Sequence, residues 1–162
     1  MATLTAWAFK DAYGAEQAAE RLRGLQAQQL IDVQDAAIVS WEVDKKKPKT
    51  RQLNNLAAAG ALGGTFWGML FGLIFFVPLL GAAVGAAIGA LTGSLADVGI
   101  DDSFINAVKE QVTPGTSALF LLTSDAVLDR IRQEFPESHA KLIASNLSAE
   151  QEAKLRETFS EE

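Results

Sequence analysis

The chain has 162 residues, the length of one domain, with 14 Lys+Arg against 20 Asp+Glu and a formal net charge of −6. This acidic balance argues against a nucleic-acid-binding domain, which is usually strongly basic, so nucleic acid is not an expected partner. The chain has no cysteine and a single histidine. Disulfides, thiolate metal sites and cysteine nucleophiles are therefore excluded, and little remains for a histidine-based centre.

Residues 1–54 predict the first half of an α/β domain. Residues 3–9 alternate in character and favour a β-strand. Residues 11–30 carry an apolar stripe at helical spacing, and residues 35–43 and 50–53 read as two further strands.

A basic cluster lies where this half ends. It consists of Lys45, Lys46, Lys47, Lys49 and Arg51. Such a run is either a solvated loop or a contact with lipid headgroups. Because positively charged flanks stay on the cytoplasmic side, this end of the first half is expected in the cytoplasm.

The middle of the chain is a block without charge. Residues 52–96 hold no Asp, Glu, Lys or Arg; residues 1–51 hold 8 basic and 7 acidic side chains, and residues 97–162 hold 6 and 13. Pro78 divides the block into helices expected at 56–77 and 79–96, which would reach roughly 33 and 27 Å. A bilayer core is about 30 Å thick, so residues 55–96 predict a transmembrane helical hairpin that turns at Pro78.

Each expected helix of the hairpin carries a glycine at every fourth position. The two rows are Gly60, Gly64, Gly68 and Gly72, and Gly81, Gly85, Gly89 and Gly93. Glycine is costly inside a water-exposed helix, whereas a row of glycines lets two helices approach closely in lipid. The rows either face each other and close the hairpin, or at least one of them faces a neighbouring subunit. A third reading is a buried helical pair inside a soluble assembly.

Residues 97–162 predict the second half of the domain. A short helix is expected from Asp101 to Val112, a buried strand over 117–123, a helix over 125–135, a strand over 141–146 and a terminal helix over 148–159. The predicted fold class is α+β, a ferredoxin-like sheet-and-helix domain split by the apolar two-helix hairpin.

No catalytic, cofactor-binding or metal-binding residues are expected. The acidic side chains Asp97, Asp101 and Asp102 suit a helix start better than a cation, and His139 has no ligand pattern around it. Ser117 and Ser124 have no matching base. The polar residues of the hairpin are few, which disfavours a proton relay.

Several motifs together resemble a bacterial family of predicted membrane proteins of unknown function. The matching positions are Leu30, Ile31, Asp35 and Ala36; Pro78 with the glycine rows; Gly99, Ile100, Asp102 and Phe104; Pro114, Gly115, Ser117, Ala118, Leu119 and Phe120; and Leu147, Ser148 and Glu150. The sequence departs from the family in the KKKPKTR loop, where a shorter turn is common. The resemblance implies a membrane protein and carries no activity or substrate.

The sequence therefore predicts a non-enzymatic, self-associating protein of the bacterial inner membrane, with both polar flanks in the cytoplasm and no cofactor. No signal peptide is expected at its start. Two alternatives stay open. One is a small oligomeric pore lined by Thr65, Thr92 and Ser94; the other is a soluble shell or ring with the hairpins packed inside.

Overall fold

The computed structural model describes residues 2–28, 35–46, 48–52, 67, 70–76, 100, 102–134 and 141–147. In chain order the elements are β1 (Ala2–Phe9), α1 (Gly14–Ala27), β2 (Asp35–Ser40), β3 (Lys49–Gln52), the π-helical turn η1 (Gly72–Phe76), α5 (Asp102–Gln111), β4 (Ser117–Ser124), α6 (Asp125–Glu134) and β5 (Lys141–Leu147). The predicted α+β class is confirmed. The expected terminal helix over 148–159 lies outside the described residues.

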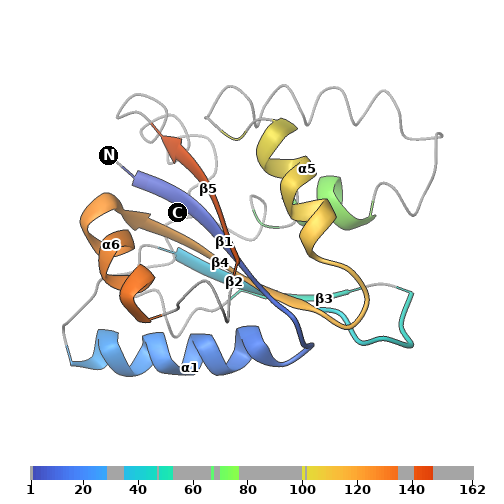
Figure 1. The fold of residues 1–162 in the computed structure, drawn as a ribbon, viewed down its shortest axis with the longest axis horizontal. Coiled ribbons are helices and arrows are strands. Elements are labelled where there is room, and N and C mark those ends of the chain that lie inside the picture. The colour runs from blue at the N-terminus through green and yellow to red at the C-terminus, as the bar shows by residue number, and fades with distance from the viewer. Residues whose placement is uncertain are drawn as a thin grey trace, which may run out of the picture.

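The strands form one antiparallel sheet in the order β3-β2-β4-β1-β5 (Figure 1). The strands β1 and β2, which α1 connects, are separated by β4; the strands β4 and β5, which α6 connects, are separated by β1. Each helical crossover therefore skips one strand, which is the split β-α-β arrangement. As a result, the sheet interleaves strands from before and after the charge-free block.

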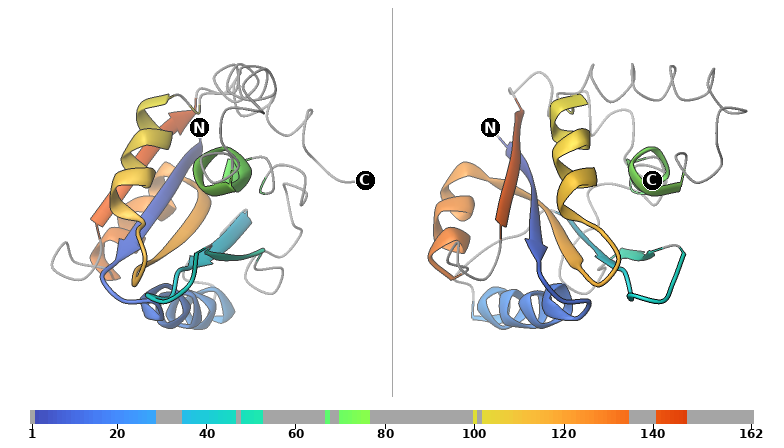
Figure 2. Two further views of the ribbon diagram at one scale, coloured as in Figure 1. Left: turned by 90° about the vertical axis from the view of Figure 1, so that its right-hand side faces the viewer. Right: turned by 45° about the vertical axis from the view of Figure 1, so that its right-hand side comes forward.

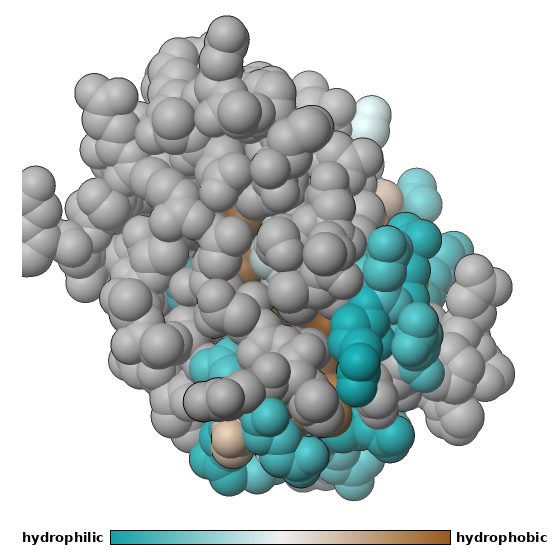
Figure 3. All heavy atoms as spheres, turned by 90° about the vertical axis from the view of Figure 1, so that its left-hand side faces the viewer, coloured by the Kyte–Doolittle hydropathy of each residue, from teal (hydrophilic) through white to brown (hydrophobic). Residues whose placement is uncertain are grey.

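Helices α1 and α6 cover one face of this sheet (Figure 2). Side chains alternate between the faces of a strand, and here every second residue of the central strands points to the helices. The buried cluster comprises Trp7, Phe9, Ala15, Ala18, Leu22, Ala36, Ile38, Leu119, Leu121 and Ile131. Seen from the side of α6, the outer atoms of the described residues are mostly hydrophilic, with hydrophobic atoms in the recesses (Figure 3). The sheet and these two helices thus form two layers with a hydrophobic core between them.

The opposite face is covered by α5 and by part of the charge-free block, residues 67 and 70–76, which we call the docked segment. Its buried side chains are each at most 4% exposed: Trp67, Leu70, Phe71, Ile74 and Phe75. Their spacing of i, i+3, i+4, i+7 and i+8 is that of an amphipathic helix with one apolar face on a core. In the sequence these residues were expected to face lipid; in the structure they are covered by the sheet.

Phe120 of β4 is the centre of this contact. In register it has Ala6 of β1 and Ala37 of β2 as its two neighbours, so small side chains surround its ring. The ring centroid of Phe120 lies 5.0 Å from that of Phe71 and 6.3 Å from that of Trp67, both edge-on. Edge-to-face rings at these separations attract beyond their buried area.

Two element boundaries differ from the prediction for local reasons. The helix α1 begins at Gly14 and not at residue 11, because Asp11 Oδ1 accepts the Tyr13 N–H at 2.9 Å and holds a turn. A Cβ on Gly14 would lie 2.6 Å from the Cβ of Phe9, so glycine fits this start. The strand β2 ends at Ser40 and not at residue 43, because the Lys45 N–H donates to the Glu42 carbonyl and closes a turn.

Replacing Phe120 by Ala should destabilise the chain by about 3–5 kcal/mol, since it removes the ring around which the docked segment packs. Urea unfolding followed by circular dichroism measures the loss. Phe120→Leu, which keeps most of the volume, should cost less than about 1.5 kcal/mol. Equal, small losses for both variants would contradict the central position of this ring.

Candidate interaction surface

The connection between β2 and β3 is a compact turn. We call residues 41–51 the basic turn; they comprise this connection, 41–48, and the first three residues of β3. The Trp41 indole Nε1–H donates to the Lys45 carbonyl at 3.0 Å, and the Lys45 N–H donates to the Glu42 carbonyl at 3.2 Å. These bonds fix the backbone from which the lysine side chains extend.

The basic turn is tied to the turn that enters β4. The Trp41 N–H donates to the Thr116 carbonyl at 2.9 Å, and the Trp41 carbonyl accepts the Gly115 N–H at 2.6 Å. Gly115 has φ of 90°, and a Cβ there would lie 2.9 Å from Val43 Cγ2. Both the backbone conformation and the close approach of Val43 therefore require glycine at this position.

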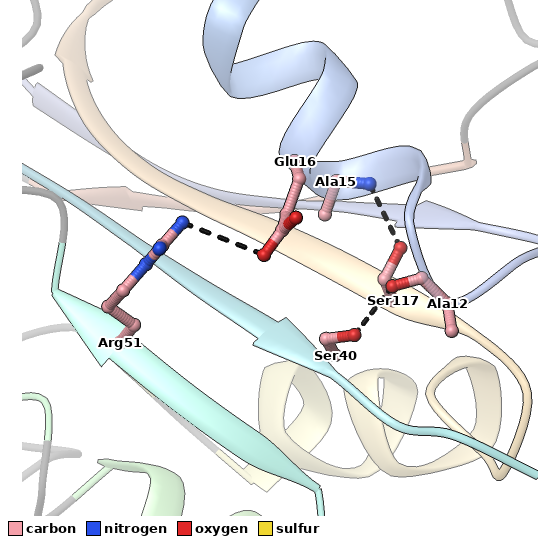
Figure 4. A network of polar contacts seen from close by, with 6 residues as sticks. All are labelled: Ala12, Ala15, Glu16, Ser40, Arg51 and Ser117. Carbon is pink, nitrogen blue, oxygen red and sulfur yellow. Dashed lines mark hydrogen bonds and ion pairs between the residues drawn. The ribbon is translucent and has the colours of Figure 1, made fainter.

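The described lysines and the arginine of the basic turn are exposed, as is Asp44, whereas Glu42 is half-buried. Arg51 forms an ion pair with Glu16 of α1 at 3.7 Å (Figure 4). Within the described part of the chain, no carboxylate lies in ion-pair distance of Lys45, Lys46 or Lys49. Val43, two residues before Lys45 in the same turn, is 78% exposed. Lys47, the remaining residue of the predicted cluster, lies outside the described residues.

Two serines fix α1 next to this turn (Figure 4). The N-cap residue Tyr13 makes no side-chain cap. In its place, Ser117 Oγ accepts the Ala15 N–H at 2.9 Å and donates to the Asp11 carbonyl at 2.7 Å, while Ser40 Oγ donates to the Ala12 carbonyl. Strands β2 and β4 thus hold the first turn of α1, which carries Glu16 opposite Arg51.

Trp41 connects the basic turn to the docked segment. Its ring meets that of Phe75 edge-on, with centroids 6.2 Å apart and an interplanar angle of 88°. The same ring is bonded through Nε1 to the basic turn. The lysines and the charge-free block are therefore neighbours in space as well as in sequence.

One residue of the predicted glycine rows is described, and it is not packed. Gly72 is half-buried, and a Cβ built on it meets no heavy atom of the described residues within 4 Å. The remaining predicted packing residues, together with the turn residue Pro78, lie outside the described residues: Gly60, Gly64, Gly68, Gly81, Gly85, Gly89 and Gly93. The pore-lining candidates Thr65, Thr92 and Ser94 lie there too.

The described residues hold no group of three potential metal ligands among His, Cys, Asp and Glu. In the same part of the chain, no helix combines the length and apolarity needed to cross a membrane. Ser117, considered earlier for nucleophilic chemistry, has its hydroxyl engaged in holding α1.

Sequence reasoning did not anticipate the contact of the docked segment with the sheet. The sequence does carry a signal for this contact, which is the helical spacing of its large apolar residues. This spacing places Trp67, Leu70, Phe71, Ile74 and Phe75 on one face of a helix and Gly72 on another. The exposure of Val43 had no signal, because it depends on the turn that follows Trp41.

Replacing Ser117 by Ala should destabilise the chain by about 1–2 kcal/mol, because the Ala15 N–H and the Asp11 carbonyl both lose a partner. Thermal or urea unfolding measures this change. Ser103→Ala on the exposed surface of α5 is the control and should change stability by less than about 0.5 kcal/mol. Indistinguishable losses would show that the serine cap does not hold α1.

The family whose model matches residues 61–160 is described as protein of unknown function (DUF1269). The match extends from the charge-free block through α5, β4, α6 and β5. No curated protein and no solved structure matches the chain. Since the match covers more than half of the sequence, the chain belongs to the DUF1269 family, whose function is unknown.

Proposed function

We propose that the chain is a non-enzymatic, self-associating membrane protein in which a ferredoxin-like domain carries a glycine-zipper hairpin over residues 55–96. The observation that carries this proposal is the orientation of the docked segment. Its aromatic face is buried on the sheet, while Gly72 faces open space among the described residues. The side of the segment that carries Gly72 is thus left for a partner.

Self-association gives the glycines a physical role. A glycine inside a helix costs about 1 kcal/mol relative to alanine, and no contact within the described chain requires Gly72. A flat glycine face allows the backbone of a second helix to approach closely, which is how helices associate in lipid. A second copy of the chain offers the same face, so the proposed assembly is a homo-oligomer.

The interleaved sheet supports a hairpin with both flanks on one side of a membrane. Strands β1 and β2 precede the charge-free block and β4 and β5 follow it, yet β4 pairs with both β1 and β2. A block that crossed the bilayer once would separate these strands. Two crossings return the chain to its starting side, and the basic turn favours the cytoplasmic side of the bacterial inner membrane.

The docked segment favours a second candidate, a soluble assembly in which the hairpins pack on protein. Trp67, Phe71 and Phe75 cannot cover the sheet and face lipid at the same time. In a membrane form, either these residues leave the sheet or the bilayer contacts are confined to other parts of the block. In a soluble assembly the observed contact is retained and neighbouring copies cover the rest.

Membrane fractionation with an alkaline-carbonate wash, followed by light-scattering mass, separates the two candidates. Retention in the pellet and a need for detergent support the membrane protein. Release as a large particle without detergent supports the soluble assembly. A monomer in both conditions contradicts self-association.

Gly72→Leu should weaken self-association about tenfold or more, equivalent to about 1.4 kcal/mol of lost helix packing. The matched control is Gly24→Leu in α1, where an added Cβ also meets nothing within 4 Å. Both changes replace glycine by a residue of higher helix propensity, so a loss of association confined to Gly72→Leu reports the face that this side chain fills. Concentration-dependent light scattering measures the association. Unchanged association for Gly72→Leu would refute a role of this glycine between subunits.

A further inference from the structure

We propose that the basic turn is a docking surface for anionic lipid headgroups, and that Trp41 reports and couples this contact to the docked segment. The inference rests on the proposed membrane association and names the lipid chemistry and the residues that meet it. The proposed headgroup contacts are Lys45, Lys46 and Lys49, and Val43 is the proposed apolar contact.

The basic turn offers positive charge to a partner. Lys45, Lys46 and Lys49 are exposed, and none is neutralised by a carboxylate of the described residues. Arg51 pairs with Glu16 at 3.7 Å. Among the described residues of the basic turn, the three lysines are therefore the cations without an ion-pair partner. Clusters of lysines beside a membrane-associated segment bind anionic headgroups, and the attraction falls off within a Debye length.

An exposed apolar side chain precedes the lysines in the same turn. Val43 is 78% exposed, and its Cγ2 approaches the position that a Gly115 Cβ would occupy. Val43 therefore lies beside the turn that enters β4 and still exposes most of its side chain. Val43 stands between Glu42 and Asp44 in the chain, two residues before Lys45. An exposed apolar side chain this close to lysines suits the boundary between headgroups and acyl chains, where the apolar part is buried and the cations stay at the phosphates.

The basic turn also contacts the charge-free block. Trp41 bonds to the Lys45 carbonyl and meets the Phe75 ring edge-on at 6.2 Å. A surface that engages lipid through Lys45 thus lies directly beside the apolar segment. Indole rings also favour the interface between water and lipid, so Trp41 is suited to that position.

An acidic surface of another protein would satisfy the lysines equally well. The exposed Val43 and the adjoining charge-free block favour lipid, because both prefer an apolar phase that an acidic protein surface does not provide. The test below distinguishes these two partners.

The test uses the full chain with vesicles of phosphatidylcholine alone or mixed in equal parts with phosphatidylglycerol. The Lys45→Glu/Lys46→Glu variant is compared with Arg130→Glu/Lys141→Glu, which makes the same change in charge on α6 and on the opposite edge strand β5. Each lysine at an anionic surface contributes roughly fivefold to binding, so two reversals should weaken flotation with the anionic vesicles by about 25-fold or more. The control variant should float like the unmodified chain.

The Trp7→Phe/Trp67→Phe background leaves Trp41 as the reporter. A headgroup quencher in the anionic vesicles should reduce Trp41 emission, and the Lys45→Glu/Lys46→Glu change should abolish this effect. Circular dichroism of each variant confirms folding before lipid is added.

Each outcome has one meaning. Flotation that both variants weaken equally, or flotation without quenching of Trp41, overturns the docking surface and leaves membrane association intact. Absence of flotation with either vesicle overturns membrane association itself. A change of oligomer mass on Lys45→Glu/Lys46→Glu without lipid assigns the lysines to an acidic protein partner and overturns the lipid proposal.

Discussion

The contact between Phe120 and the docked segment determines how the domain accommodates its long insertion. Phe120 stands between Ala6 and Ala37 on the three central strands, and these short neighbours leave space for the rings of Phe71 and Trp67. Were the neighbours large, the segment would be held farther from the sheet. The insertion therefore completes the core of the domain in which it is inserted, and α5 packs beside it on the same face.

This contact explains why an apolar block is an ambiguous signal. Burying apolar surface gains about 25 cal/mol per Å² whether it is buried in protein or lipid, because lipid tails are about as apolar as leucine. The aromatic residues from Trp67 to Phe75 therefore satisfy either environment. The two environments differ in where glycine lies relative to the contact. Against a sheet, large side chains fill the space and glycine turns away, as Gly72 does; between two close helices, glycine itself lies at the contact.

The sequence predicted the strands and helices of the two flanks well, because their signals are local. The run from Ser117 to Thr123 is almost continuously apolar, and β4 is indeed central and covered on both faces. The start of α1 was missed because the Asp11 turn competes with the helix for the same backbone groups. The alignment of Phe120 with Ala6 and Ala37 was out of reach, since it joins residues far apart in the chain.

The sequence predicted which basic residues form the candidate surface, but it did not predict how they are arranged or what they contact. The lysines are visible in the sequence, but the sequence does not show which basic residue has a partner. In the structure Arg51 pairs with Glu16 of α1, whose start is held by Ser117 and Ser40. The backbone of Trp41 is bound to the turn before β4, and its ring touches Phe75. Movement of the docked segment would thus change the packing of the same indole that closes the basic turn. The basic turn and the docked segment, which are close in sequence, are therefore also connected in space through the side chain of Trp41.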